Sequence, residues 1–310
     1  MVSETLLRIG TRGSPLALAQ AHETARRLGA AHGVDPGRFA IVVFKTSGDR
    51  IQDRPLSEAG GKGLFTKELE QALLEGAIDI AAHSAKDMAT TLPPGLAIAA
   101  FLEREDPRDA LIAPGVATLA DLPHGAVVGS ASLRRQAQLK RLRPDLRPVL
   151  FRGNVETRLR KIAEGAADAT LLALAGLKRL GLEGHASEIL PVETFLPAVG
   201  QGAIALETRE ADAEARRLVA AIGHRDTEIA VRAERAFLAV LDGSCRTPIA
   251  GHARVEGGRV AFRGQILTPD GSEAHETERE GPAAEADALG RAAGEELRAR
   301  GGPAFFGGPV

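Results

Sequence analysis

The sequence predicts two α/β domains with largely parallel sheets, followed by a small α+β domain at the C-terminal end. Strand-like apolar runs alternate with helix-like segments up to residue 102, and the alternation repeats from residue 103 to about 202. Beyond residue 226 the pattern changes to short strand-like stretches between two helical ones. A chain of 310 residues, 44% of them hydrophobic, is long enough for two or three domains.

In the first domain, residues 6–9 are predicted to form a strand that leads into a helix. Ser14 suits the N-cap of this helix and Pro15 its first position. The apolar face of the helix consists of Leu18, Ala21, Ala25 and Leu28. Further strands are predicted at 41–44, 78–83 and 96–101, with a helix at 65–75. The Gly-rich segment 47–63 is longer than most connections, and we expect a mobile cover there.

The second domain and the C-terminal part follow the same kind of reasoning. Strands are predicted at 126–129, 149–152 and 169–174, each followed by a helix, and residues 103–109 are interpreted as a polar crossing between the domains. In the C-terminal part we predict a helix at 227–241, strands at 252–256 and 259–267, a turn at 269–271 and a helix at 283–300. The last ten residues are expected either to fray or to pack Phe305 and Phe306 on the body.

The composition excludes several classes of function. A formal net charge of −2 gives no general attraction for nucleic acid, and Tyr and Trp are absent as stacking platforms. The chain has neither a signal-peptide pattern nor an apolar run long enough to span a membrane, so we expect a cytoplasmic protein without a membrane partner. The single cysteine, Cys245, excludes an internal disulfide. One cysteine and eight scattered histidines form no zinc-type ligand cluster, so no metal is expected.

Cationic and hydroxyl side chains gather where predicted strands end and helices begin. Free backbone N–H groups and the helix dipole favour anions at such ends, and the planar guanidinium pairs well with carboxylates. A single arginine is more often a surface residue or an ion-pair partner, so the argument depends on joint placement. Arg134 and Arg135 are the clearest case, because adjacent positive charges at a helix start oppose the dipole and require an anion nearby. The residues that predict this anion site are Arg12, Ser14, Ser84, Lys86, Asp87, Ser130, Ser132, Arg134, Arg135, Arg152 and Arg158.

Two residues have both a structural and a chemical interpretation. Asp87 is either a helix-end carboxylate paired with Lys86, or a proton donor and counter-ion to a developing positive charge. Cysteine is usually a small buried hydrophobe, but the Gly, Ser and Pro neighbours of Cys245 favour an exposed loop, and the adjacent Arg246 favours the thiolate. The residues alone leave both questions open.

Two glycine-rich stretches match nucleotide-binding motifs only weakly. The sequence GQGAIA at 200–205 fits a dinucleotide pattern, but Pro197 precedes it and no clean strand does. The sequence GGKGLF at 60–65 has Gly63 where a Walker motif has Ser or Thr. A nucleotide-dependent enzyme is therefore not predicted.

Nine motifs in order along the chain resemble those of one family. They are GTRGSPLALAQ, GGKGLFTKELE, HSAKD, EREDPRDA, GSASLRRQAQL, FRGNVETRL, AGLKRLGL, LPAVGQGA and LDGSC, between residues 10 and 245. In order and approximate spacing they resemble the porphobilinogen deaminases, also called hydroxymethylbilane synthases. The resemblance implies two domains similar to type II periplasmic binding proteins that face each other across a cleft, plus a cofactor-bearing C-terminal domain. The implied boundaries are residues 1–102 with 203–220, residues 103–202, and residues 221–310.

The resemblance also implies a chemistry. Cys245 would hold a dipyrromethane cofactor through a thioether, and Asp87 would assist the loss of ammonia from porphobilinogen and stabilise the azafulvene-type cation. Four additions and a hydrolysis would release hydroxymethylbilane, a step of tetrapyrrole and heme biosynthesis. The expected protein is a cytoplasmic transferase, a monomer whose partner is the small-molecule substrate.

The family motifs also assign residues to the two ligands. Ser84 and Arg179 join the substrate side, Lys62 and Phe65 border the mobile loop, and Asp49 matches a position near the cofactor. The cofactor residues implied are Cys245, Lys86, Asp87, Ser132, Arg134, Arg135 and Asp49. The substrate residues implied are Arg12, Ser14, Lys62, Phe65, Ser84, Arg152, Arg158 and Arg179.

The sequence departs from the family pattern at two motifs. Ala85 and the Met-Ala pair at 88–89 stand where many members have a bulkier residue and then Val-Pro, and Ser244 stands where Gly is common. Neither departure removes a reactive group, but Ser244 restricts the backbone beside the expected attachment point more than glycine would.

The main alternative is a two-lobed binding module that captures small anions with the same fold, because a fold does not determine a function. A solute-binding protein or a regulator's effector domain needs neither Asp87 nor Cys245. A secreted receptor would also have a signal peptide, and a transcription regulator a helix-turn-helix domain, for which the N-terminal residues leave no room.

Overall fold

The computed structural model describes residues 5–50, 63–241 and 247–306, which form two compact units. The first unit contains residues 5–50, 63–105 and 203–228, and the second contains residues 106–202, 229–241 and 247–306. Cys245, Ser244 and Lys62 lie outside the described residues, and so does the side chain of Asp49. Each unit is described by itself below.

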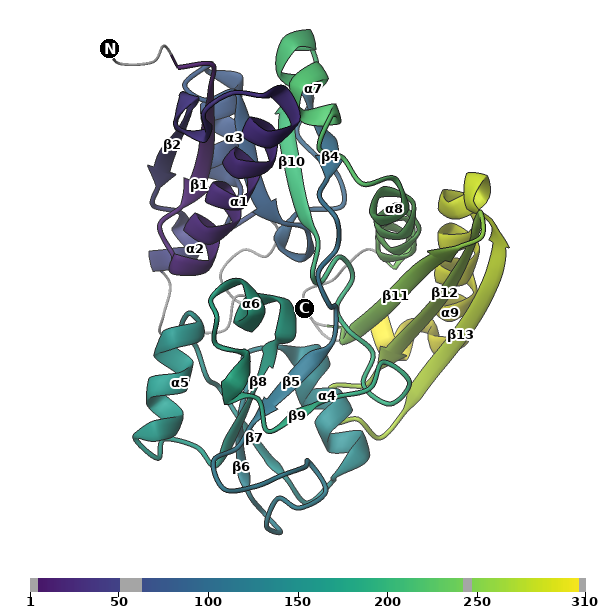
Figure 1. Ribbon diagram of the computed structural model, residues 1–310. Helices are drawn as coiled ribbons and strands as arrows, with labels where there is room; N and C mark the ends of the chain where they lie inside the picture. Colours follow the sequence, from purple (N-terminus) through teal and green to yellow (C-terminus); the bar gives the residue numbers. More distant parts are fainter. Residues whose placement is uncertain (1–4, 51–62, 242–246, 307–310) are drawn as a thin grey trace. The chain divides into compact units, whose positions relative to one another are not determined.

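The first unit is a five-stranded sheet between helices (Figure 1). In chain order its elements are β1 (Leu7–Arg12), α1 (Pro15–His32), η1 (Pro36–Arg38), β2 (Phe39–Phe44), α2 (Ser47–Arg50), α3 (Lys67–Leu74), β3 (Ile80–Ser84), η3 (Ala85–Asp87), β4 (Leu96–Phe101), β10 (Ile204–Arg209) and α7 (Ala213–Ala220). The strand order is β2-β1-β3-β10-β4, and β10 is antiparallel to both of its neighbours. Apolar residues of α1 and α7 pack on one face of the sheet, and those of α3 pack on the other.

Local signals explain how this unit begins. The hydroxyl of Ser14 accepts a hydrogen bond from the Ala17 N–H at 3.3 Å, and Pro15 occupies the first helical position, as predicted. Helix α1 ends at Gly33, whose φ of 64° is the left-handed conformation that glycine adopts most easily. Because α1 begins directly after β1, the end of that strand is fixed relative to the helix N-terminus.

The second unit contains another five-stranded sheet. Its elements are β5 (Asp109–Ile112), β6 (Val127–Gly129), α4 (Leu133–Leu142), β7 (Arg147–Val149), α5 (Val155–Ala163), β8 (Ala169–Ala173), α6 (Leu174–Arg179), η4 (Glu183–His185) and β9 (Glu188–Ile189). The strand order is β7-β6-β8-β5-β9, with β5 antiparallel to β8 and β9. Residues 103–109 were interpreted only as a polar crossing, so the strand that begins at Asp109 was missed.

The two sheets have the same order of strands. In each sheet the edge strand β2 or β7 pairs with β1 or β6, which in turn pairs with β3 or β8. An antiparallel strand, β10 or β5, then lies between that strand and the last one, β4 or β9. Each inserted strand is the first strand that the chain forms after it enters the unit from the other one. Strand β5 follows β4 of the first unit, and β10 follows residue 202 of the second. The prediction of two α/β domains is therefore confirmed.

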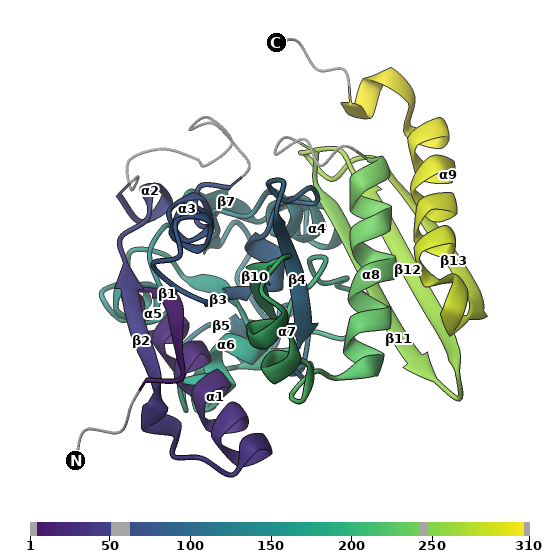
Figure 2. The same cartoon turned by 90° about the horizontal axis from the view of Figure 1, so that it is seen from above.

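The C-terminal part of the chain forms a three-stranded antiparallel sheet with two helices (Figure 2). The elements are α8 (Arg225–Val240), β11 (Ile249–Glu256), β12 (Arg259–Leu267), β13 (Ala274–Pro282), η5 (Ala283–Glu285) and α9 (Ala286–Phe306). Gly290 and Gly294 let α9 approach α8 closely, since a Cβ at either position would lie within 3 Å of α8 atoms. Phe305 and Phe306 pack on this core rather than fray.

Strand β13 was not predicted, and its sequence shows why. Residues 274–282 read AHETEREGP and lack the alternation of apolar and polar residues that marks a half-buried strand. The strand forms because it pairs with β12 along its full length, from Ala274 opposite Leu267 to Pro282 opposite Arg259. Tertiary pairing thus overrides a polar sequence here.

Within the second unit, two contacts join the C-terminal part to the α/β part. The buried carboxylate of Glu234 in α8 accepts hydrogen bonds from Gly200 N–H at 2.6 Å and from Ala253 N–H at 2.7 Å. Gly271, in the turn between β12 and β13, lies against α4. The hydrogen bond of Glu234 to Gly200 and the contact of Gly271 with α4 therefore join the two parts.

Replacing Gly271 tests the contact with α4. A Cβ at this position would lie 2.4 Å from the Ala137 carbonyl oxygen, and its φ of +73° is already costly for any other residue. Gly257→Ala is the matched control, because its φ is +56° but no atom lies within 4 Å. We expect Gly271→Ala to lower the free energy of unfolding by about 1–3 kcal/mol more than the control, measured by urea unfolding. Equal losses would show that the turn does not depend on this contact.

Candidate functional site

At the end of β1 in the first unit, a cation lies against an aromatic ring. The Arg12 guanidinium is 4.0 Å from the centroid of the Phe65 ring, a distance at which a cation–π attraction operates. The Gly48 N–H donates to the Leu64 carbonyl at 2.7 Å, so the residues on both sides of segment 51–62 are bonded to each other. Arg12, Phe65 and the Ser14 cap are thus brought together at one strand end.

The neighbouring strand β3 ends in Ser84, Lys86 and Asp87. The Ser84 hydroxyl accepts a hydrogen bond from the Gln20 amide at 2.9 Å, while Lys86 is exposed and Asp87 is half-buried. Within the described part of the chain, the Asp87 carboxylate has no hydrogen bond or ion pair. Because β1 and β3 are adjacent parallel strands, the carboxyl ends that carry Arg12 and Asp87 lie at the same edge of the sheet.

A buried acid–base pair fixes the strand that carries these residues. His83 Nε2 lies 3.0 Å from Glu207 Oε2 on the inserted strand β10, and their side chains are 3% and 0% exposed. Nearby, burial raises the pKa of Glu70, and the charge of Glu207 raises it further. The Ala85 N–H also donates to the Ala203 carbonyl at 3.0 Å. Strand β3 is therefore held to β10 immediately before Asp87.

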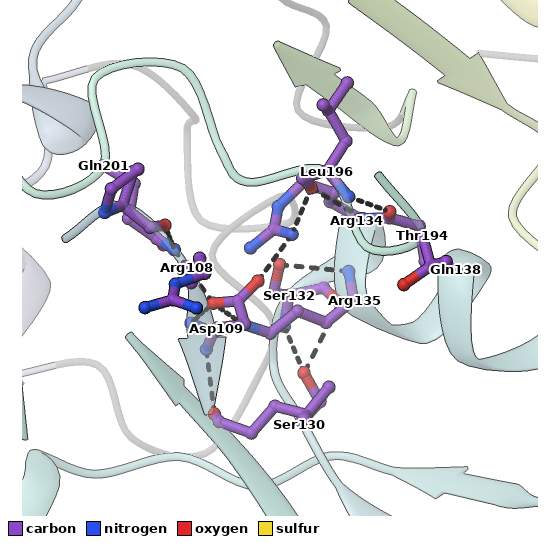
Figure 3. Close-up of polar contacts among 12 residues, drawn as sticks. Arg108, Asp109, Ser130, Ser132, Arg134, Arg135, Gln138, Thr194, Leu196 and Gln201 are labelled. Atoms are coloured by element: carbon purple, nitrogen blue, oxygen red, sulfur yellow. Dashed lines mark hydrogen bonds and ion pairs between the residues drawn. The ribbon is translucent and has the colours of Figure 1, made fainter. Parts of the chain in front are cut away.

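In the second unit, Arg134 and Arg135 both contact one buried carboxylate (Figure 3). Arg135 Nη2 donates to Asp109 Oδ1 at 2.6 Å, and Arg134 Nη1 lies 2.8 Å from Asp109 Oδ2. Asp109 is 0% exposed. Burial alone would raise the pKa of this carboxyl, but the charges of Arg134 and Arg135 outweigh burial and hold the pKa well below its ordinary value.

The chain itself thus supplies one anion, Asp109, to the two adjacent arginines. Ser132 serves as the N-cap of α4, where its hydroxyl accepts from the Arg135 N–H at 3.4 Å, and the Ser132 N–H donates to the Ser130 hydroxyl at 3.2 Å. Asp109 was not predicted from the sequence. Two observations could have identified it: the adjacent arginines require an anion, and Asp109 lies in the motif EREDPRDA. Gln201 was not predicted either, although it lies in both GQGAIA and the family motif LPAVGQGA.

Further cations lie near this pair in the second unit. Burial lowers the pKa of Arg158 to about 10, and the positive charges of Arg135 and Arg152 contribute to the shift. Arg158 Nε donates to the Gly153 carbonyl at 2.9 Å, and no described carboxylate forms an ion pair with it. Arg179 Nη2 donates to the Gly202 carbonyl at 3.0 Å. Arg135, Arg152 and Arg158 therefore form a concentration of positive charge that favours binding of an anion.

The predicted residues thus fall into two sets. The first unit contains Arg12, Ser14, Phe65, Ser84, Lys86 and Asp87, and the second contains Ser132, Arg134, Arg135, Arg152, Arg158 and Arg179. Among the described residues, no group of three or more His, Cys, Asp or Glu side chains is arranged to hold a metal ion. No helix in the described ranges is long and apolar enough to cross a membrane.

Comparisons with known proteins agree along nearly the whole chain. A family model described as "Porphobilinogen deaminase, dipyromethane cofactor binding domain" matches residues 7–217, and one described as "Porphobilinogen deaminase, C-terminal domain" matches residues 228–299. The porphobilinogen deaminase of Nitrobacter winogradskyi is 62% identical over 98% of this chain and 96% of that protein. The porphobilinogen deaminase of Nitrobacter hamburgensis is 60% identical over the same shares.

Solved structures with some likeness are more distant. The periplasmic VFT2 domain of Bordetella pertussis BvgS has a TM-score of 0.39 and 19% identity, covering 69% of this chain and 86% of that chain. Protein PG110 from Staphylococcus aureus has a TM-score of 0.43 and 12% identity, covering 93% of this chain and 99% of that chain.

The lowered pKa of Asp109 predicts a pH-dependent contribution to stability. Because the carboxyl is more acidic in the folded chain than in the unfolded one, where its pKa is about 3.9, its ion pairs stabilise the fold above about pH 4. That stability is lost as the pH falls from about 4 towards the folded-state pKa. We expect the difference in unfolding free energy between the wild type and Asp109→Asn to stay constant from pH 5 to 8 and to shrink below pH 4, measured by urea unfolding. A difference that is unchanged at pH 3 would contradict the assignment.

Proposed function

The chain belongs to the porphobilinogen deaminase family, and from that membership we propose that it condenses four porphobilinogen units, with loss of ammonia, on a dipyrromethane primer attached to Cys245, and releases hydroxymethylbilane by hydrolysis. The observation that carries the proposal is the cation cluster of Arg135, Arg152 and Arg158. Burial and mutual repulsion lower the pKa of Arg158, and no described carboxylate neutralises it through an ion pair.

This cluster suits a ligand with many carboxylates. Porphobilinogen has an acetate and a propionate on its ring, so each added ring brings two more negative charges. Guanidinium groups pair with such carboxylates through two parallel hydrogen bonds, and a buried guanidinium gains more from that pairing than an exposed one. Arg152 and Arg158 of the second unit, with Arg12 of the first, are our candidates for binding substrate carboxylates. Arg179, Ser14, Ser84, Lys62 and Phe65 complete the proposed substrate set.

The residues also fit the implied cofactor. Arg134 Nε is buried without a hydrogen-bond partner, and a carboxylate oxygen of the cofactor is one acceptor that would satisfy it. We assign Lys86, Asp87, Ser132, Arg134, Arg135 and Asp49 to its binding and Cys245 to its attachment. When bound, the dipyrromethane supplies a pyrrole carbon as nucleophile. Cys245, Lys62 and the side chain of Asp49 lie outside the described residues, so their assignment depends on the family motifs.

Asp87 is the proposed catalytic residue. Its carboxylate is half-buried and makes no hydrogen bond to a described residue, so it is available to a ligand. In its protonated form an Asp87 oxygen can donate a proton to the departing amine, and the resulting carboxylate then lies beside the positive charge left on the pyrrole. Its hydrogen bond to the pyrrole N–H would orient the substrate. The hydrogen bond between His83 and Glu207 fixes the end of strand β3 that carries Asp87.

The remaining proposals concern the setting of the reaction. We propose a cytoplasmic monomer, with domain boundaries at residues 1–102 with 203–220, 103–202 and 221–310. The alternative, a module that only captures anions, predicts neither a covalent adduct nor turnover.

Intact-protein mass spectrometry tests the attachment. We expect the purified chain to exceed its sequence mass by two condensed pyrrole units, and Cys245 is the only cysteine that could carry them through a thioether. The Cys245→Ser variant should show the sequence mass alone. Ser244→Gly serves as the control, since it keeps the thiol and should keep the adduct. A fully active wild-type preparation without added mass would contradict the proposal.

Replacing Asp87 with Asn tests its role in proton transfer. Asn has nearly the same shape but carries neither a charge nor an acidic proton. We therefore expect kcat to fall by about 100-fold or more, with the KM for porphobilinogen changed less than tenfold, measured by ammonia release from primer-loaded enzyme. Glu23→Gln, whose carboxylate pairs with Arg27 within α1, is the control and should keep both parameters. If Asp87→Asn turns over at near the wild-type rate, Asp87 has no part in the chemistry.

A further inference from the structure

Asp109 and the two arginines form a buried cluster with unequal charge. The Asp109 side chain is 0% exposed, and those of Arg134 and Arg135 are 6% and 7% exposed. One carboxylate cannot neutralise two guanidinium groups, so the cluster has an excess positive charge. Burying an uncompensated charge is costly, which favours a further anion at this place.

The two arginines are bound to the chain in different ways. All three guanidinium nitrogens of Arg135 donate within the protein: Nε and Nη2 to Asp109 Oδ1, and Nη1 to the Leu171 carbonyl at 2.9 Å. Arg134 uses Nη1, which donates to the Leu196 carbonyl at 2.8 Å and pairs with Asp109 Oδ2, while its Nε has no partner. Asp109 Oδ2 likewise has no aligned hydrogen bond. Arg135 is therefore fixed, and Arg134 keeps a donor for something else.

Two glutamines complete the network around the carboxylate (Figure 3). The Gln201 amide nitrogen donates both to the Pro107 carbonyl at 2.7 Å and to Asp109 Oδ1 at 2.9 Å, and Gln201 is 1% exposed. Gln138 bonds both backbone groups of Leu196, whose carbonyl also accepts from Arg134. Gln201 thus fixes Asp109, and Asp109 in turn fixes the arginines.

A second carboxylate with two arginines shows what a purely structural cluster looks like. Asp79 in the first unit accepts hydrogen bonds from Arg8 at 2.7 Å and from Arg209 at 3.1 Å. No side-chain atom of these three residues is buried without a partner, whereas the cluster of Asp109 leaves two such atoms. The Asp79 cluster is more exposed, since the side chains of Arg8 and Arg209 are 40% and 23% exposed, whereas the buried donor of Arg134 has no partner within the chain and is open to a further acceptor.

We propose that Asp109 and Gln201 are positioning residues for the reaction: they hold Arg135 and one end of Arg134 so that the remaining donors of Arg134 are directed to a carboxylate of the pyrrole primer. This inference rests on the proposed function, in which Arg134 binds the primer. Neither residue contacts the ligand itself. Asp109 acts through its ion pairs, and Gln201 acts through its hydrogen bond to Asp109.

The test measures how the chain acquires its primer. Primer-free protein, produced in cells that make no porphobilinogen, is incubated with increasing porphobilinogen, and the fraction with added mass is followed by intact-protein mass spectrometry. The variants are Asp109→Asn and Gln201→Met, and Asp79→Asn is the matched control because it breaks a carboxylate–diarginine cluster in the other unit. All are assayed at a temperature where circular dichroism shows them folded. Gln201→Met removes only hydrogen bonds, so it keeps the test valid if Asp109→Asn does not fold.

We expect the porphobilinogen concentration at half-maximal loading to rise about tenfold or more for Asp109→Asn and Gln201→Met, and to stay within twofold for Asp79→Asn. A double-mutant cycle separates positioning from stability. In an Arg134→Gln background, Gln201→Met should have little further effect on that concentration, because the group it positions is already gone. Wild-type loading in a folded Gln201→Met variant, or full additivity with Arg134→Gln, would overturn the inference. A wild type that never gains mass would instead overturn the proposed function.

Discussion

The full burial of the Asp109 carboxylate is the constraint on which the arrangement of the second unit depends. A charge at that depth must be paired, and leaving one partner unpaired typically costs about 3–5 kcal/mol. Asp109 is the first residue of the inserted strand β5, so its partners must come from elements on both sides of that strand. Helix α4 supplies two arginines, and Gln201 comes from the segment that leads back to the first unit. One carboxylate therefore fixes the inserted strand, the start of α4 and the return of the chain together.

The same solution occurs in the first unit with different residues. The inserted strand β10 carries Glu207, whose side chain is 0% exposed and lies 3.0 Å from His83. His83 precedes Ser84 directly, and Arg135 lies in the turn of α4 that Ser132 caps. In each unit, a buried carboxylate on the antiparallel inserted strand holds the parallel strand or helix whose end carries the proposed ligand-binding residues. In both units this specific buried polar contact helps to fix the register of the inserted strand.

Local signals in the sequence predict much of this fold, and long-range pairing explains what they miss. Ser14 and Pro15 predict the start of α1 because capping involves residues three positions apart. Strand β13 was missed because residues 274–282 have a polar sequence and form a strand only through pairing with β12. Asp109 and Arg135 are 26 positions apart, and Asp109 and Gln201 are 92 apart. The periodicity of apolar residues along the chain gives no information on contacts between such distant positions. The two adjacent arginines at a helix start did indicate that an anion was needed. Cys245 is the single cysteine of the chain, but its proposed role depends on the family motif LDGSC around it.

Arg135 has all three guanidinium nitrogens hydrogen-bonded within the chain, whereas Arg134 keeps one without a partner. This difference suits a primer that must stay bound while rings are added to it. A guanidinium that faces a bare, buried site binds a carboxylate strongly, because the attraction between opposite charges is larger in a low-dielectric environment. A guanidinium already paired with an internal carboxylate gains less, since the incoming anion also meets the charge of Asp109. Pairing Arg135 fully and Arg134 at one end therefore moderates the attraction without removing it. In the proposed reaction the primer stays attached while rings are added, so the cations that bind its carboxylates must keep their geometry throughout. The internal carboxylate of Asp109 fixes Arg135 and one end of Arg134 and so preserves that geometry.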